Sequence, residues 1–159
     1  KTALFSKLLD QPPPNDEVTA QAVCVGSKMF LLERATGSGS SSPRSVTFWD
    51  VPTDGKSLSG SSASTLALKA ANICIFVFDR TSHQTWIEIT QAWQELKLRC
   101  QEDSSELPAA LLVGNYADVG TKCIFEKEIR RFLKKNERRV KFVEASARTG
   151  DGVLEVERK

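Results

Sequence analysis

The sequence AALLVGNYAD, residues 109–118, joins a short apolar run to a polar end. The apolar part predicts a buried strand over Ala109 to Gly114. Folds built around a mostly parallel sheet place their ligands just beyond the carboxyl ends of the strands. Asn115-Tyr116-Ala117-Asp118 directly follows the predicted strand, so this segment is a candidate binding motif.

The regions on both sides of this stretch alternate in the same way between strand and helix. Upstream, Ala71 to Asp79 predicts a buried strand, and Thr85 to Cys100 predicts a helix whose apolar residues recur at spacings of three and four. Downstream, Glu126 to Asn136 predicts a helix and Val140 to Val143 a strand. This alternation predicts an α/β fold with a mostly parallel central sheet and helices on both faces.

The N-terminal part of the chain has a different pattern. Thr2 to Leu9 has a helical apolar face, and the prolines Pro12 to Pro14 end that helix. Val18 to Glu33 and Val46 to Trp49 are β-prone, whereas Ala35 to Arg44 between them is mostly Gly and Ser. These features predict a helix followed by two strands with a flexible connection.

Composition limits the classes of function. The 159 residues, 40% of them hydrophobic, predict a single domain. A formal net charge of +2 gives no reason to expect nucleic acid or an anionic membrane as the partner. The longest dense apolar run, Ile73 to Phe78, is far shorter than the ~20 residues that cross a bilayer. No membrane-spanning segment is therefore predicted.

The cysteines are scattered and form no C-x-x-C pair. They predict small core residues in a reducing compartment, in contrast to a disulfide framework or a zinc site. The chain opens on Lys1 without a charged-then-apolar signal segment. These features predict a cytoplasmic location and a chain that is part of a longer polypeptide. The cysteines are Cys24, Cys74, Cys100 and Cys123.

Polar residues at the predicted strand ends resemble, in order and spacing, the five nucleotide-binding motifs of Ras-like small GTPases. Asp79-Arg80-Thr81 followed by Thr85-Trp86 is similar to a pattern of the Rab branch. The resemblance implies a P-loop NTPase (Ras-like) fold over residues 1–159. This single domain would lack the first strand, the glycines of the P-loop and most of the last helix. The resembling residues are Lys1-Thr2, Thr19, Asp50, Asn115 to Asp118, and Ser146-Ala147-Arg148.

On the phosphate side, the resemblance implies binding of GTP or GDP with Mg²⁺. Lys1 would neutralise the β and γ phosphates, and the Thr2 hydroxyl would hold Mg²⁺. Taken alone, this pair also fits an ordinary helix start. Thr19 would complete the Mg²⁺ shell, although a solvent-facing threonine in a loop is the alternative. Asp50 would order Mg²⁺ through water.

The segment after Asp50 departs from the Asp-x-x-Gly pattern of the family. Thr53 stands at the glycine position, where a Cβ would crowd the phosphate; an alternative register uses Gly55. The glutamine that positions the attacking water is then replaced by Asp54 or Lys56. Neither side chain combines a donor with an acceptor as a carboxamide does, so we expect weak intrinsic hydrolysis.

On the base side, Asn115 to Asp118 resembles Asn-Lys-x-Asp. The Asp118 carboxylate would accept hydrogen bonds from guanine N1 and N2, and Asn115 would tie its loop to the P-loop. Tyr116 replaces the family lysine; its ring could stack on the purine but carries no charge. The alternative is an ordinary turn rich in Asn and Asp after a strand.

Ser146-Ala147-Arg148 resembles the last motif of the family, Ser-Ala-Lys. In that motif the Ala147 amide would donate to guanine O6. Together with the Asp118 carboxylate, this amide predicts a pocket for a guanine nucleotide. No Cys-a-a-X terminus is visible up to Lys159, so the sequence shows no membrane anchor.

A basic cluster is interleaved with the inward-facing residues of the helix predicted near residue 130. It predicts a solvated helix face first, with a docking site for an acidic protein partner as the alternative. The cluster comprises Lys122, Lys127, Arg130, Arg131, Lys134, Lys135, Arg138, Arg139 and Lys141.

Two functions remain open at this point. The first is a nucleotide-dependent switch whose loops order on the γ-phosphate. The second is a scaffold subunit, a pseudo-GTPase that binds nucleotide statically or not at all, which the replaced glycine and glutamine positions favour. A kinase or other P-loop ATPase is disfavoured by the two base-side motifs. Lys1 to Leu4 and Leu112 to Asn115 are similar to Rab-like GTPases of the intraflagellar transport complex, which implies a trafficking or ciliary complex.

Overall fold

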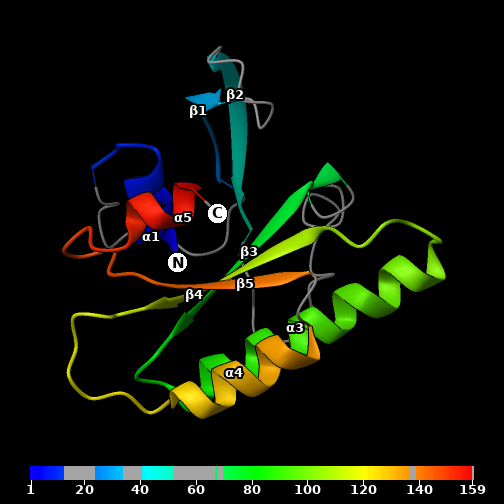
Figure 1. Ribbon diagram of the computed structural model, residues 1–159, viewed down its shortest axis with the longest axis vertical. Helices are drawn as coiled ribbons and strands as arrows, with labels where there is room; N and C mark the ends of the chain where they lie inside the picture. The colour runs from blue at the N-terminus through cyan, green and yellow to red at the C-terminus, as the bar shows by residue number, and fades with distance from the viewer. Residues whose placement is uncertain (13–23, 34–40, 52–66, 68–69, 137–138, 159) are drawn as a thin grey trace.

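The computed structural model describes residues 1–12, 24–33, 41–51, 67, 70–136 and 139–158. Figure 1 shows the arrangement of its helices and strands. In chain order the elements are α1 (Thr2–Leu8), β1 (Cys24–Glu33), β2 (Ser41–Asp50), β3 (Ile73–Asp79), α3 (His83–Glu102), β4 (Ala109–Asn115), α4 (Glu126–Lys135), β5 (Val140–Glu144) and α5 (Val153–Arg158).

The central layer is a three-stranded parallel sheet in the order β3-β4-β5. Ile73 of β3 is in register with Ala109 of β4, and Ala110 of β4 with Val140 of β5. Helices α3 and α4 lie along one face of this sheet, and α1 and α5 lie on the other (Figure 1). The predicted α/β architecture, with a parallel sheet covered on both faces, is confirmed.

A hydrophobic core fills each face of the sheet. On the α3 and α4 side, the Phe76 ring meets Trp93 edge-on, with centroids 6.0 Å apart. Trp93 is fully buried, and its Nε1 donates a hydrogen bond to Asn136 Oδ1 at 2.9 Å, so burial leaves no unpaired indole N–H. The other face is closed by the apolar side chains Leu4, Leu8, Leu111, Val113, Val143, Val153 and Val156.

The strands β1 and β2 form a separate antiparallel pair, with Cys24 opposite Asp50. The pair of strands was predicted, but the flexible connection expected over Ala35 to Arg44 is wrong at its end, because residues 41–44 belong to β2. Pairing with β1 supplies the backbone hydrogen bonds that this Ser-rich segment needs, and local composition does not reveal that pairing. The rest of the predicted connection, residues 35–40, lies outside the described residues.

The start of α3 is fixed by a short side-chain network at the carboxyl end of β3. Asp79 Oδ1 accepts hydrogen bonds from the Thr81 backbone N–H and hydroxyl, both at 2.7 Å. The Thr85 hydroxyl accepts a hydrogen bond from the Asp79 backbone N–H at 3.1 Å. These contacts satisfy polar groups where the strand gives way to the helix, so the Asp-x-Thr pattern has a structural role here.

The cysteines only partly follow the prediction that they are core residues. Cys74 on β3 is buried, and burial raises the pKa of its thiol to about 11. Cys123 is exposed, so the prediction is wrong for this residue. Its loop is held by the backbone, since the Cys123 N–H donates to the Arg80 carbonyl at 2.8 Å, and the side chain is left outside.

Among the described residues, no helix is long and apolar enough to cross a membrane.

Candidate functional site

The two predicted base-side motifs meet at the carboxyl ends of the neighbouring strands β4 and β5. The Ala147 backbone N–H donates to Asn115 Oδ1 at 2.9 Å in a buried position. The Ala117 N–H donates to the Ala145 carbonyl at 3.1 Å, and the Ala145 N–H to the Gly114 carbonyl at 3.0 Å. Parallel pairing thus joins two motifs that are distant in sequence into one unit.

Tyr116 holds a left-handed backbone conformation, with φ of 64°. A tyrosine rarely adopts this region, so the turn is an outlier that its surroundings must stabilise. The Val119 N–H closes the turn by donating to the Tyr116 carbonyl at 3.1 Å. The tyrosine side chain is exposed as a result. The turn also brings the Asp118 carboxylate back toward the loop after β5.

Asp118 forms an ion pair with Arg148 across the two motifs. Its Oδ2 accepts a hydrogen bond from Arg148 Nε at 3.0 Å and a second from Nη2. The other carboxylate oxygen, Oδ1, is buried and accepts no hydrogen bond from the residues that the structure describes. The Ser146 hydroxyl and the Arg148 guanidinium lower the pKa of the Asp118 carboxyl. The carboxylate is therefore ionised at neutral pH.

The loop after β5 is held by its own hydrogen bonds. Ser146 is fully buried, and its Oγ accepts a hydrogen bond from the Thr149 N–H at 3.1 Å. The Ser146 N–H donates to the Asp151 carbonyl at 2.9 Å. Gly152 has φ of 73°, and a Cβ there would collide with the Glu144 carbonyl oxygen. Glycine is therefore needed where the chain passes back over the end of β5.

The phosphate-side residues lie where α1 meets the end of β2. Lys1 Nζ is 3.5 Å from Asp50 Oδ1 and also donates to the Val51 carbonyl. Asp50 is buried, and Thr2 is the first residue of α1. The structure thus brings Lys1 and Asp50 together, with Thr2 next to Lys1 in the chain. The remaining predictions on this side lie outside the described residues; they concern Thr19, Thr53, Asp54, Gly55 and Lys56.

Sequence reasoning missed a buried arginine behind the base-side motifs. Arg80 is only 3% exposed, and its Nη2 donates to the Ile124 carbonyl at 3.2 Å. Its Nη1 forms an ion pair with Glu144, and its backbone N–H donates to the Asn115 carbonyl at 3.2 Å. Burial lowers the pKa of Arg80, with the charge of Glu126 acting in the opposite direction. The available signal was a charged residue directly after a buried strand.

Asp50 is the candidate Mg²⁺ ligand on the phosphate side of the site. Within the described parts of the chain, no three His, Cys, Asp or Glu side chains gather into a metal site. Mg²⁺ commonly binds through one or two carboxylates together with substrate phosphates and waters. The Asp50 carboxylate beside Lys1 and Thr2 fits that donor set, in which the nucleotide supplies further oxygens.

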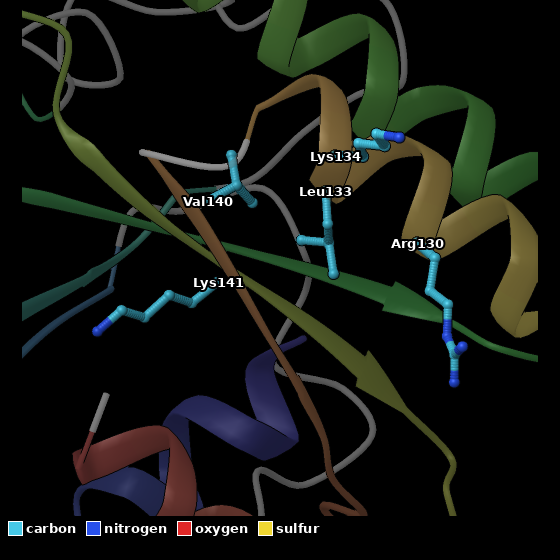
Figure 2. Close-up of a pocket in the computed structure, with 5 residues that line it drawn as sticks. All are labelled: Arg130, Leu133, Lys134, Val140 and Lys141. Carbon is cyan, nitrogen blue, oxygen red and sulfur yellow. The ribbon is translucent and has the colours of Figure 1, made fainter.

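A hollow of about 310 Å³ lies at the opposite end of the sheet, between α4 and the start of β5. Figure 2 shows Leu133 pointing from α4 toward the sheet, with Arg130 and Lys141 extending to different sides. Its lining combines two apolar with three basic side chains: Leu133, Val140, Arg130, Lys134 and Lys141. The hollow is separate from the base-side motifs, because these follow the carboxyl end of β5.

Comparison with known proteins identifies the family. A family model described as the Ras family matches residues 45–158, which extend from within β2 to the end of α5. A search of curated proteins gives no match. The matched segment covers the parallel sheet, both base-side motifs and Asp50, in agreement with a P-loop NTPase fold. The chain therefore belongs to the Ras family of small GTPases, whose members bind guanine nucleotides.

Proposed function

We propose that this chain is an atypical, Rab-like small GTPase that binds GTP or GDP with Mg²⁺. One observation supports the proposal: Asn115 and Ala147 are hydrogen-bonded at the ends of adjacent parallel strands, and the Asp118 carboxylate is paired with Arg148, the residue after Ala147. The buried Asp118 Oδ1 has no well-formed hydrogen bond among the described residues, with only the Ser146 hydroxyl acting on the carboxylate beside Arg148. Buried acceptors are costly unless a donor reaches them, and the N–H groups of a guanine edge are suitable donors.

Asp118 would read the guanine N1–H and N2–H groups, as the family resemblance implies. Adenine presents no such pair of donors, so this carboxylate would discriminate against it. The Ala147 amide would donate to guanine O6, and would then share or exchange its present contact with Asn115 Oδ1. The Ser146 hydroxyl would favour the ionised form of the Asp118 carboxylate. The exposed Tyr116 ring could stack on the base.

The phosphates and Mg²⁺ would lie near the start of α1. Lys1 Nζ would leave Asp50 for the phosphate oxygens, and Asp50 would hold Mg²⁺ together with Thr2 and Thr19. Mg²⁺ would neutralise phosphate charge in the bound nucleotide. Without a glutamine after Asp50, no carboxamide orients an attacking water, and intrinsic hydrolysis would be weak.

The alternative is a pseudo-GTPase scaffold. Two groups expected to contact the base already have internal partners, since Arg148 binds Asp118 Oδ2 and Asn115 binds the Ala147 amide. When no nucleotide is bound, such a site leaves fewer polar groups without a hydrogen-bond partner, so the empty protein is destabilised less. This observation favours weak or static nucleotide binding, as in a subunit of a trafficking or ciliary transport complex.

A protein partner is part of the proposal, and the hollow between α4 and β5 is its docking site. The apolar Leu133 and Val140 would receive one hydrophobic side chain, and the basic Arg130, Lys134 and Lys141 would attract acidic neighbours of it. Arg130 already has one acidic contact, Glu126 Oε1 at 3.1 Å, whereas α4 as a whole remains basic. Charge complementarity therefore favours an acidic protein segment.

The nucleotide proposal is tested by direct titration. Purified protein stripped of nucleotide is titrated with GDP, GTP, ADP and ATP in the presence of Mg²⁺ by calorimetry, and nucleotide released by denaturation is identified by mass spectrometry. We expect guanine nucleotides alone to bind. Equal affinity for ATP and GTP would contradict the proposed role of Asp118 in recognising guanine. Absence of any bound or binding nucleotide would support the scaffold alternative.

A further inference from the structure

The carboxylate proposed to read guanine is already engaged by a side chain of the same chain. Arg148 Nε and Nη2 both donate to Asp118 Oδ2. These two donors lie on one edge of the planar guanidinium group. Guanine presents a similar edge, with adjacent N–H donors at N1 and N2 on a planar frame. One carboxylate oxygen is thus occupied by a group that has the same donor pattern as the base.

We propose that Arg148 is an internal competitor of guanine, whose guanidinium occupies the Asp118 carboxylate until a base displaces it. This inference rests on the proposed function, because it concerns the same base site. Its consequence is a lower apparent guanine affinity than the site would otherwise have. The competitor is part of the chain, so every binding event must first break its contacts with Asp118.

The two members of the pair differ in their freedom to move. The Arg148 side chain is 78% exposed, whereas the Asp118 side chain is only 10% exposed. Asp118 also follows the closed turn at Tyr116, whose Ala117 N–H is bound to the Ala145 carbonyl. Arg148 can therefore turn into water at little loss of packing, while the carboxylate stays in position. This asymmetry means that the ion pair can open by movement of the Arg148 side chain alone.

The opposite charges of Arg148 and Asp118 hold the two side chains together when no base is bound. The Ser146 hydroxyl and Arg148 lower the pKa of the Asp118 carboxyl, so the contact joins two ionised groups at neutral pH. Exposed ion pairs are weak and are screened by salt, so the barrier to displacement is modest. Oδ1 is buried and has no well-formed hydrogen bond among the described residues, although the Ser146 hydroxyl favours the ionised carboxylate; Arg148 therefore engages only one of the two carboxylate oxygens.

The family motif has lysine at this position, and the difference is chemical as well as steric. A lysine ammonium is a point charge without a planar edge, so it cannot present two parallel donors as arginine does. Arg148→Lys therefore keeps the charge but removes the resemblance to guanine. Arg148→Ala removes both. Comparing these two variants separates the effect of donor geometry from the effect of charge.

The test titrates GDP with Mg²⁺ into nucleotide-stripped wild-type protein and the two variants. Calorimetry gives the dissociation constant, and stopped-flow fluorescence of a labelled GDP gives the association rate. We expect both variants to bind GDP roughly two- to fivefold more tightly and to associate faster. Arg44→Ala, which removes an exposed arginine from β2, serves as the matched control and should bind like wild type. Equal or weaker binding by Arg148→Ala overturns the proposal.

A second measurement tests the internal contact first without nucleotide and then with GDP. In ¹⁵N-labelled stripped protein, the Arg148 Nε–H signal, assigned by its loss in Arg148→Lys, should exchange with water roughly two- to fivefold more slowly than that of the exposed Arg44. Saturating GDP should make this exchange faster. Rapid exchange in the stripped protein overturns the internal contact itself. A protected signal in a protein for which neither wild type nor variants bind GDP would instead show that the proposed function is wrong, and the competition with it.

Discussion

The Arg80 guanidinium forms an ion pair with the Glu144 carboxylate at the point where β3, β4 and β5 end side by side. Glu144 directly precedes the loop that contains Ser146, and Arg80 also donates to the Ile124 carbonyl at 3.2 Å. The aliphatic part of Arg80 packs near Gly114, where a Cβ would be 3.0 Å from Cδ. One side chain therefore holds the strand ends from which both base-side motifs emerge.

Arg80→Met should destabilise the fold and loosen the base site. It removes a buried cation that pairs with Glu144, and Lys122, 3.4 Å from Glu144, would compensate for only part of the lost charge. We expect the free energy of unfolding to fall by about 1–3 kcal/mol, as measured by urea denaturation. GDP affinity at temperatures where the variant is folded should also fall. Arg80→Lys should recover only part of this stability, since one ammonium nitrogen cannot reach both Glu144 and the Ile124 carbonyl as the separate guanidinium nitrogens do.

The control for this prediction is Lys122→Met, which removes the other partner of Glu144. Lys122 is more exposed than Arg80, so its loss should cost at most about 1 kcal/mol and leave GDP affinity unchanged. If the two variants behave alike, Arg80 acts only through the charge of Glu144. Its contacts with the neighbouring backbone would then be unimportant.

Asp118→Asn should exchange guanine specificity for xanthine specificity. The asparagine amide donates where the carboxylate accepts, so it matches the carbonyl at C2 of xanthine but not the N2 amino group of guanine. We expect GDP affinity to fall by on the order of a hundredfold and xanthosine diphosphate to bind better than GDP. Asp103→Asn, the same change at the end of α3, is the matched control. Unchanged GDP affinity in Asp118→Asn would place the base elsewhere.

Hydrolysis of GTP should be slow. The residues after Asp50 offer no glutamine to orient water, so a single-turnover rate no faster than on the order of 10⁻⁴ s⁻¹ is expected. The measurement is phosphate release from preloaded protein at a fixed Mg²⁺ concentration. A rate on the order of 10⁻² s⁻¹ without an activator would mean that the segment after Asp50 supplies a catalytic group that its sequence does not suggest.

Binding of an acidic segment at the α4 and β5 hollow should depend on its own basic residues and not on general charge. The double variant Lys134→Glu and Lys141→Glu should weaken binding of a glutamate-rich peptide with a central leucine by roughly tenfold. Fluorescence anisotropy at two salt concentrations measures this, and higher salt should weaken wild-type binding.

The matched control reverses the same number of charges on the same helix outside the hollow. Arg131→Glu with Lys135→Glu changes two exposed residues of α4 that do not line it. We expect less than a threefold effect, as for rim charges that act only at long range. Equal losses in the two double variants would reduce the docking site to a generally basic, solvated helix face.

The sheet could be predicted from sequence because its strands are short, apolar and separated by helices. Ile73–Asp79 and Ala109–Asn115 agree with the predicted strands to within a few residues. That the two base-side motifs lie near each other was expected from the family resemblance, whereas the hydrogen bond from the Ala147 N–H to Asn115 Oδ1 was not predicted. The strand predictions rest on periodicity and topology, which local sequence carries well.

Other features depend on side-chain directions that no spacing reveals. Arg80 follows a buried strand and precedes a polar turn, so it resembles an exposed residue, and its burial depends on tertiary partners such as Glu144. The contact of Arg148 with Asp118 depends on a side-chain rotamer. The length of β2 depends on pairing with β1. In each case a residue distant in sequence decides the local structure.

The packing of α1 against α5 has a consequence for how the protein assembles on the ribosome. Leu4 and Leu8 of α1 share a core with Val153 and Val156 of α5, so two helices that are far apart in sequence pack on the same side of the sheet (Figure 1). Synthesis proceeds from the N-terminus, so the apolar face of α1 must wait until α5 (Val153–Arg158) has been made before α5 can cover it. Contacts of such long sequence separation close slowly. A nascent chain arrested before Val153 would therefore present α1 to chaperones, whereas a chain in which α5 has emerged and folded would not.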